Sequence, residues 1–176
     1  MAGTNQIPER LINFRCYRNG TDLLGVATVT LPQFQAMTDT VSGAGIAGEV
    51  ETPVLGHYSS ITTTVAFRTI TADVTSLAAQ MAHPLDFRGS QQVYDASSGK
   101  FVTQAVKLSI RGVPKNVNLG NFEVGATTGT EVEMECTYIK LDVGGKTLVE
   151  IDKFNYIARF GDEDALESVC KDLGLA

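Results

Sequence analysis

Three glycines, Gly43, Gly45 and Gly48, have the GxGxxG spacing of a dinucleotide-binding loop. In that motif a strand delivers the glycines to the N-terminus of a helix, which holds the pyrophosphate of the cofactor. Here the next residues are EVETPVLG, which include Pro53 and have no helical period. The glycines therefore indicate a flexible or hairpin loop, because glycine adopts backbone angles that other residues avoid.

The histidines and serines lack the surroundings that a catalytic nucleophile needs. His57 lies in a long irregular segment and His83 precedes a proline that ends a helix, so we expect both to be surface or packing residues. No GxSxG elbow is present, and Ser98-Gly99-Lys100 lacks the upstream glycine of a phosphate loop. Two histidines are also few for a metal site. We expect no catalytic residue, no cofactor and no metal.

Glu131, Glu133 and Glu135 form the one remaining cluster of like groups, and a strand would place all three carboxylates on one face. A solvated outer surface is the simplest interpretation. Calcium is disfavoured because it takes ~6–8 oxygens from converging elements rather than from a single row. A wall that repels an anionic substance is the third interpretation, and the sequence does not rank it further.

The three cysteines, Cys16, Cys136 and Cys170, are far apart and odd in number. This spacing suits neither zinc nor a disulfide framework, so we expect reduced, buried thiols in a cytosolic protein. The N-terminal residues MAGTNQIPER contain no apolar run, and no stretch approaches the ~20 apolar residues of a membrane span. We expect no secretion signal and no membrane anchor.

The charge of the chain argues against a nucleic-acid-binding protein. The 176 residues include 14 Lys and Arg against 20 Asp and Glu, for a net charge of −6. The acidity is concentrated in residues 121–176, which hold 12 acidic and 5 basic side chains. Tight DNA binding requires clustered Lys and Arg to neutralise phosphates, and the sequence has no such cluster.

Alternation of apolar and polar residues predicts that most of the chain is antiparallel strand. Asn19-Gly20, the DASSGK segment and Gly144-Gly145 are typical of hairpin turns. The predicted strands cover residues 12–17, 23–31, 61–67, 85–94, 102–111, 130–143 and 147–152.

The strand over 130–143 changes parity along its length. Val132, Met134 and Cys136 are its apolar set at first, whereas Ile139, Leu141 and Val143 are apolar later. A one-residue slip moves every following side chain to the other face, so the pattern predicts a bulge near Thr137 or a strand that serves two surfaces.

Two segments have a helical period. The first begins at Asp73, carries Val74, Leu77, Ala78 and Met81 at i, i+3, i+4 and i+7, and ends at His83-Pro84. The second is expected to be capped by Asp162, to place Leu166, Val169, Cys170 and Leu173 on one face, and to stop at Gly174.

These elements predict one mainly β domain over residues 1–176. The expected fold packs two antiparallel sheets in a sandwich or barrel, with a flanking helix and a short C-terminal helix. Residues 33–58 follow neither period, and we expect a long extended loop there. A patternless connection of about 25 residues is usually functional or ordered by a partner.

Three segments resemble one known family. Residues 136–166, CTYIKLDVGGKTLVEIDKFNYIARFGDEDAL, resemble the end of the major tail tube protein of contractile-tailed bacteriophages. Residues 42–56, SGAGIAGEVETPVLG, are similar to the glycine-rich loop of that family, and VKLSIRG at 106–112 is similar to its strand ending in Arg-Gly. The resemblance runs in order over nearly the whole chain and weakens at 33–41 and 59–71.

The resemblance implies a non-enzymatic structural protein without cofactors. Members form hexameric rings that stack into a hollow tube inside a contractile sheath, through which the genome is delivered. The implied partners are further copies of the chain, the tail sheath protein, and the baseplate, tail terminator and tape measure proteins, while DNA crosses the lumen without specific binding. The implied location is the virion tail, assembled in the cytoplasm of the bacterial host.

Two sets of residues become candidates for assembly in this setting. The first are expected to contact a neighbouring subunit: Val41, Gly43, Gly45, Ile46, Gly48, Val50, Val54 and Leu55. The second, Glu131, Glu133 and Glu135, are expected to line the lumen and to repel phosphates. The sequence leaves open a tube protein of a headless bacteriocin or a type VI-like secretion system and, with less support, a small-ligand β-barrel.

Overall fold

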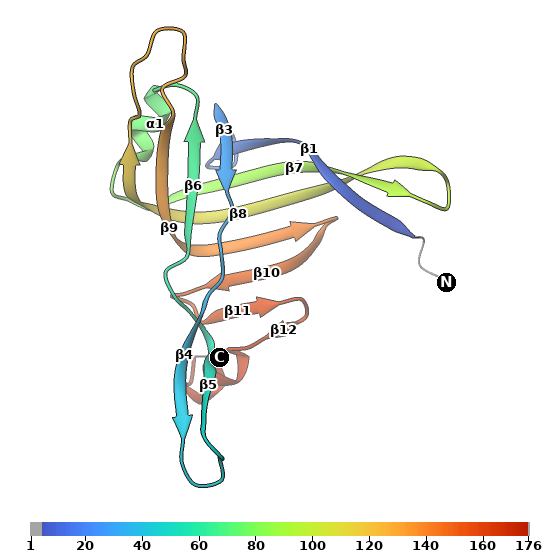
Figure 1. The fold of residues 1–176 in the computed structure, drawn as a ribbon, viewed down its shortest axis with the longest axis vertical. Helices are drawn as coiled ribbons and strands as arrows, with labels where there is room; N and C mark the ends of the chain where they lie inside the picture. The colour runs from blue at the N-terminus through green and yellow to red at the C-terminus, as the bar shows by residue number, and fades with distance from the viewer. Residues whose placement is uncertain (1–4, 176) are drawn as a thin grey trace.

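The computed structural model describes residues 5–175, which are mainly β (Figure 1). Helices in this part of the chain are limited to α1 (Ala72–Leu77) and α2 (Glu167–Asp172). The strands are β1 (Gln6–Arg18), β2 (Asp22–Leu24), β3 (Val26–Thr30), β4 (Ala36–Ser42), β5 (Glu49–Tyr58), β6 (Thr62–Phe67), β7 (His83–Asp95), β8 (Lys100–Asn118), β9 (Thr130–Val143), β10 (Lys146–Asp152), β11 (Ile157–Phe160) and β12 (Glu163–Asp164).

A single branched sheet of ten strands forms the body of the described chain, and every pairing in it is antiparallel. Its main path runs β12-β11-β10-β9-β8-β7-β1-β2, and a branch adds β6 to β9 and β3 to β6. The strands of the branch run nearly across the strands of the main path (Figure 1). The predicted antiparallel β fold is therefore confirmed, although its two layers share β8 and β9.

The sheet does not close into a barrel. Its path ends at β12 on one side and β2 on the other, and these strands do not pair with each other in the described residues. The described strands therefore do not form the closed barrel that the small-ligand β-barrel interpretation requires.

The branch point is the bulge that the sequence predicts at Thr137. Arg111 of β8 pairs with Tyr138 of β9, but the next residue, Gly112, pairs with Cys136, so Thr137 is the extra residue. Before the bulge β9 pairs with β6, and after it β9 pairs with β10. The change in apolar parity thus marks a strand that leaves one layer and enters the other.

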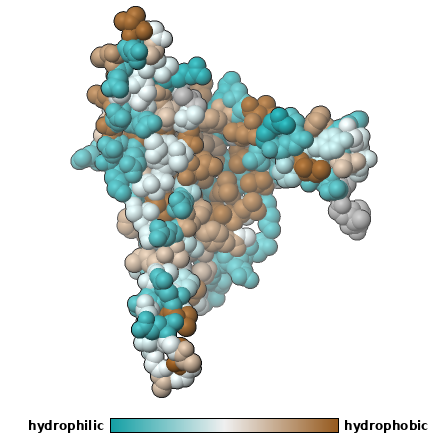
Figure 2. Space-filling view, viewed as in Figure 1, coloured by the Kyte–Doolittle hydropathy of each residue, from teal (hydrophilic) through white to brown (hydrophobic). Residues whose placement is uncertain are grey.

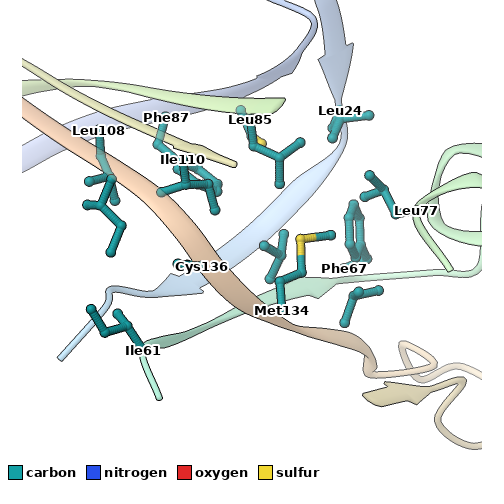
Figure 3. Close-up of a cluster of buried hydrophobic side chains, with 14 of the residues drawn as sticks. Leu24, Ile61, Phe67, Leu77, Leu85, Phe87, Leu108, Ile110, Met134 and Cys136 are labelled. Carbon is teal, nitrogen blue, oxygen red and sulfur yellow. The ribbon is translucent and has the colours of Figure 1, made fainter. Parts of the chain in front are cut away.

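The hydrophobic core lies between the two layers (Figure 3). Ile61, Val65 and Phe67 come from β6 and the residue before it, and they face Phe87, Leu108 and Ile110 of the crossing strands. Met134 and Cys136 of β9 are fully buried near the crossing. Burial of this set is the main stabilising term of the fold.

The predicted hairpins agree with the structure. Asn19 and Gly20 both have positive φ, 52° and 77°, as a type I′ turn requires. The hairpin expected from 85–94 and 102–111 is present and longer, since β7 and β8 pair from His83 with Gly112 to Asp95 with Lys100.

The first helix is shorter than its period predicts. The Thr71 hydroxyl accepts a hydrogen bond from the Val74 amide and caps α1, but the helix ends at Leu77. Met81 is 60% exposed and does not extend the apolar face. His83 is buried as the first residue of β7, where its ring nitrogen Nε2 lies 3.0 Å from the Ala79 carbonyl oxygen. Residues 78–81 form a turn and bends between α1 and β7 in place of the last helical turn.

The predicted cap of the second helix is wrong. Asp162 precedes β12, and α2 begins only at Glu167, after Leu166, which makes no side-chain capping bond. Asp164 instead connects β11 to the residue before α2, because its Oδ1 accepts hydrogen bonds from the amides of Ala158 and Leu166 at 3.2 and 3.0 Å. The predicted stop at Gly174 is confirmed by its φ of 69°.

Residues 33–58 are not an irregular loop. β4 and β5 pair from Ser42 with Glu49 to Ala36 with Tyr58 and form a separate two-stranded sheet. This hairpin projects from the body at one end of the longest axis (Figure 1). Its sequence lacks alternation because neither of its faces packs on the core, so burial does not select which positions are apolar.

Candidate assembly surfaces

The first surface is the projecting β4–β5 hairpin, which carries six exposed apolar side chains on a narrow arm. Val41 and Val50 are directly paired and therefore lie on the same face of the hairpin, and they are 43% and 48% exposed. The six side chains are Met37, Val41, Ile46, Val50, Val54 and Leu55. An apolar arm that its own chain leaves uncovered is suited to contact with another protein.

The glycines of the GxGxxG match form the tip of this hairpin. Gly43, Gly45 and Gly48 have φ values of 141°, 96° and 129°, which only glycine adopts without strain. They lie between two strands rather than before a helix, which agrees with the hairpin-loop interpretation.

The hairpin is anchored at its base. Phe34, Tyr58 and Phe160 form an aromatic cluster with ring centroids 5.8–6.3 Å apart. Gly56 has a φ of 65°, and a Cβ at this position would lie 2.5 Å from Cγ of Leu166. The direction of the arm is therefore set by side chains from β11 and the region before α2.

The second surface is the acidic face of β9. Val132 and Met134 point into the core, so Glu131, Glu133 and Glu135 lie together on the opposite face, as the period predicts. The three are not equivalent, because Glu131 is exposed whereas the other two are half-buried.

Glu135 is held by a network of donors. Its carboxylate forms ion pairs with Lys153 at 3.3 Å and Lys115 at 3.7 Å, and it accepts hydrogen bonds from the Ser60 hydroxyl and the Ile61 amide. Partial burial by itself would raise the pKa of Glu135, but the hydrogen bonds and Lys153 outweigh it and lower the pKa below its usual value. The uncompensated charge of this face belongs to Glu131 and Glu133.

The third surface is an apolar recess in the angle between β3 and the crossing strands. It has a volume of about 270 Å³ and is lined by Leu11, Phe14, Val29, Leu31, Phe87, Gly89, Gln91, Val106, Leu108 and Leu141. Figure 2 shows apolar surface gathered in this angle. The second layer thus covers only part of the inner face of the main sheet.

An unpaired strand edge lies beside the recess. β1 pairs with β7 along one edge, but β2 covers only its residues 16–18 on the other. Within the described chain, residues 6–15 leave their outer backbone groups without a strand partner. Pro8 and two register shifts interrupt this edge, which are features that limit uncontrolled sheet pairing.

The remaining chemical groups form no second site. Cys16 and Cys136 are buried, and burial raises the pKa of each thiol to about 12, whereas Cys170 is only half-buried, contrary to the expectation of three buried thiols. No cluster of three metal-ligating side chains exists in residues 5–175. In the same part of the chain no helix is long and apolar enough to cross a membrane.

The loop 119–129 between β8 and β9 is a further exposed surface that the sequence patterns do not predict. Phe122 and Val124 are 91% and 105% exposed there, the highest values among the exposed large apolar residues. Phe122 and Val124 stand among Gly, Asn and Thr residues, and this composition could have drawn attention to the segment. Composition alone does not distinguish an exposed loop from a buried one.

An open β-sheet with an apolar arm, a partly uncovered apolar face and an unpaired edge defines a structural subunit that associates with other protein. Comparison with known proteins identifies the family of this subunit. Residues 8–174 match the family described as phage tail tube protein FII. The chain belongs to this family, and its role is that of a structural subunit of a phage tail tube.

Two curated relatives agree with the assignment. The chain is 29% identical to the tail tube protein of Escherichia phage P2. The alignment is 182 residues long and covers 96% of this chain and 99% of that protein. It is 24% identical to the major tail tube protein of Serratia phage KSP20, with 86% of each chain covered. A chain in the six-fold symmetrised cryo-EM structure of the anti-feeding prophage baseplate aligns with a TM-score of 0.45 and 7% identity, over 76% of this chain and 92% of that one.

Proposed function

We propose that the whole chain acts as one tail tube domain, that six copies form a ring, and that the rings stack into a hollow tube inside a contractile sheath. The observation that carries this proposal is the projecting β4–β5 hairpin, whose apolar side chains have no cover in the subunit. Within a tube the arm reaches a neighbouring subunit and buries Val41, Ile46, Val50, Val54 and Leu55 there. The tip glycines Gly43, Gly45 and Gly48 allow the close turn.

Lateral contacts within a ring are assigned to the main sheet. A neighbour that pairs with the free edge of β1 would extend the sheet and cover the apolar recess beside it. Stable interfaces bury at least ~1,200 Å² in total, and sheet extension together with an apolar face can reach that size.

Glu131, Glu133 and Glu135 line the lumen in this proposal. Charges on a narrow low-dielectric wall are focused, whereas on an open surface they are screened beyond about 8 Å at physiological salt. The ion pairs of Glu135 leave Glu131 and Glu133 as the carboxylates that repel passing phosphates. DNA crosses without specific contacts.

The remaining parts of the proposal follow from the family. The tube has no enzymatic activity and takes no cofactor. Its partners are the sheath, baseplate, tail terminator and tape measure proteins, and it is assembled in the cytoplasm of the bacterial host.

Microscopy and sedimentation of the purified protein test the proposal. We expect rings or tubes in negative stain and a sedimenting species far above 18.8 kDa at high concentration. Replacing residues 38–53 by Asn-Gly should keep the thermal unfolding transition of the body and abolish tubes.

A matched control shortens a different hairpin. Replacing residues 96–99 by Asn-Gly keeps the pairing of Asp95 with Lys100 and should leave tube formation intact. A protein that stays monomeric with preformed tube ends present, or a shortened β4–β5 hairpin that still polymerises normally, would contradict the proposal.

A further inference from the structure

The loop 119–129 displays two apolar side chains in water at its tip. Phe122 and Val124 are 91% and 105% exposed, so neither gains appreciable contact within its own subunit. The turn that contains Val124 is closed by the hydrogen bond from the Ala126 amide to the Glu123 carbonyl, at 3.2 Å.

The neck of the loop is ordered. The Asn121 amide donates to the Thr128 carbonyl at 2.9 Å, and the Thr128 amide donates to the Arg68 carbonyl at 2.9 Å. Below them, the fully buried Thr130 donates its hydroxyl to the Leu119 carbonyl at 3.0 Å.

Gly120 closes the neck. It has a φ of 79°, and a Cβ there would lie 1.7 Å from the Thr128 carbonyl oxygen. The loop is thus tied to both of its strands and to the segment after β6, and its tip is presented at little further entropic cost. Preorganised aromatic side chains of this kind are typical of the residues that dominate binding energy.

The loop and the β4–β5 hairpin lie at opposite ends of the longest axis of the molecule (Figure 1). Each end bears exposed apolar side chains: Phe122 and Val124 on one, and Val41 and Val50 on the other. Two different patches at opposite ends permit a head-to-tail contact between copies, which propagates as an open filament when it does not close on itself.

We propose that the tip of loop 119–129 in one copy packs against the Val41 and Val50 face of the β4–β5 hairpin in the next copy along the tube. The inference rests on the proposed function and names the surface that receives the arm. Glu123 on the loop faces a hairpin that contains Asp39, Glu49 and Glu51 and has no Lys or Arg. The contact is therefore apolar and opposed by like charges, and added salt should strengthen it.

The double variant Phe122→Ser/Val124→Ser tests the contact. It should form rings but raise the critical concentration for tube growth at least about tenfold, as truncation of dominant contact residues does. Phe122→Leu/Val124→Leu keeps the apolar tip and should grow tubes. Glu123→Gln leaves both apolar residues in place and should lower the critical concentration at low salt.

The outcomes separate this inference from the proposed function. If the unaltered protein forms neither rings nor tubes, the proposed function fails before any variant is made. If the unaltered protein forms tubes and the double Ser variant forms them equally well, only the inference is overturned. Loss of the rings themselves, with an unchanged unfolding transition, also overturns it, because the loop would then act within a ring.

Cross-linking tests the identity of the receiving surface. In a Cys170→Ser background, which leaves the two buried thiols, protein carrying Val124→Cys is mixed with protein carrying Val50→Cys and assembled with a short bis-maleimide. We expect dimers joined between the two variants. The control replaces Val50→Cys by Phe101→Cys, 64% exposed on the β7–β8 hairpin, and should give none. Equal yields from both mixtures, or no cross-link in intact tubes, would refute the assignment.

Discussion

At the scale of residues, three glutamates that look alike in the sequence have different roles in the structure. Glu135 connects β9 to Lys115 of β8, to Lys153 after β10, and to Ser60 and Ile61 before β6. It ties the two layers together at the crossing, whereas Glu131 makes no ion pair in the described part of the chain. A carboxylate of this kind stabilises the fold as long as it is charged.

Replacing Glu135 by Gln should therefore destabilise the subunit at neutral pH and matter less in acid. The pKa of Glu135 is lowered from 4.5 in the folded protein, so its contribution is fully present above the unfolded value and is lost as the pH falls through the folded value. We expect a loss of about 1–2 kcal/mol at pH 7, from hydrogen bonds to a charged group.

Urea unfolding at pH 7 and at a pH below the folded pKa measures this effect. The difference between the two proteins should shrink in acid. Glu131→Gln is the matched control and should change stability little at either pH. Equal losses for the two variants would contradict the structural role of Glu135.

At the scale of elements, the β4–β5 hairpin depends on a small number of contacts at its base. Gly56 lies against Leu166 with a φ of 65°, next to the aromatic cluster of Phe34, Tyr58 and Phe160. A residue with a side chain at this position meets both backbone strain and a steric clash. The base thus sets the direction of an arm that makes few other contacts with the body.

Gly56→Ala should destabilise the subunit by about 1–3 kcal/mol and loosen the hairpin more than the core. Thermal unfolding gives the first quantity, and hydrogen exchange of β4 and β5 amides gives the second. Gly25→Ala is the control, because nothing lies within 4 Å of a Cβ at that position and its φ is not in the positive region. Unchanged exchange in the hairpin of the Gly56 variant would contradict the anchoring role.

At the scale of the whole molecule, the basic residues are unevenly distributed. The arm has acidic and apolar side chains without Lys or Arg, whereas the strands β1, β7 and β8 carry eight of the basic residues of the chain: Arg10, Arg15, Arg18, Arg88, Lys100, Lys107, Arg111 and Lys115. In a tube this arrangement would repeat in every subunit. Carboxylates that line the lumen would then form a wall of like charge that repels a polyanion.

The double variant Glu131→Lys/Glu133→Lys should assemble but retain DNA. Each substitution raises the net charge by two, and Lys neutralises phosphates, so retention should fall steeply as salt is raised. The measurement is the DNA that co-sediments with tubes assembled in its presence. Glu163→Lys/Asp172→Lys makes the same change in net charge near the C-terminus and should retain less. Equal retention by both variants, or none by either, would contradict a lumenal position for β9.

Features that depend on neighbours along the chain are predictable from the sequence. The period of two specified most strands and the β7–β8 hairpin, Asn19-Gly20 specified a turn by its backbone preference, and the parity change located the bulge at Thr137. The strand and bulge patterns are selected by burial of one face, whereas the turn follows from the backbone preference of its residues. The resemblance of three segments to tail tube proteins predicted the family, and the match over residues 8–174 confirms it.

Other features depend on contacts between residues far apart in the chain. The strands of residues 33–58 have no core-facing side, so their pairing left no alternation to detect. The helical period that starts at Asp73 continues to Met81, yet α1 ends at Leu77 and residues 78–81 form a turn and bends before β7. Lys115 and Lys153 reach Glu135 from 20 and 18 residues away, through strand pairings whose register the sequence does not state. Exposure of Phe122 likewise depends on which residues another part of the chain covers, and that is a property of long-range packing rather than of local sequence.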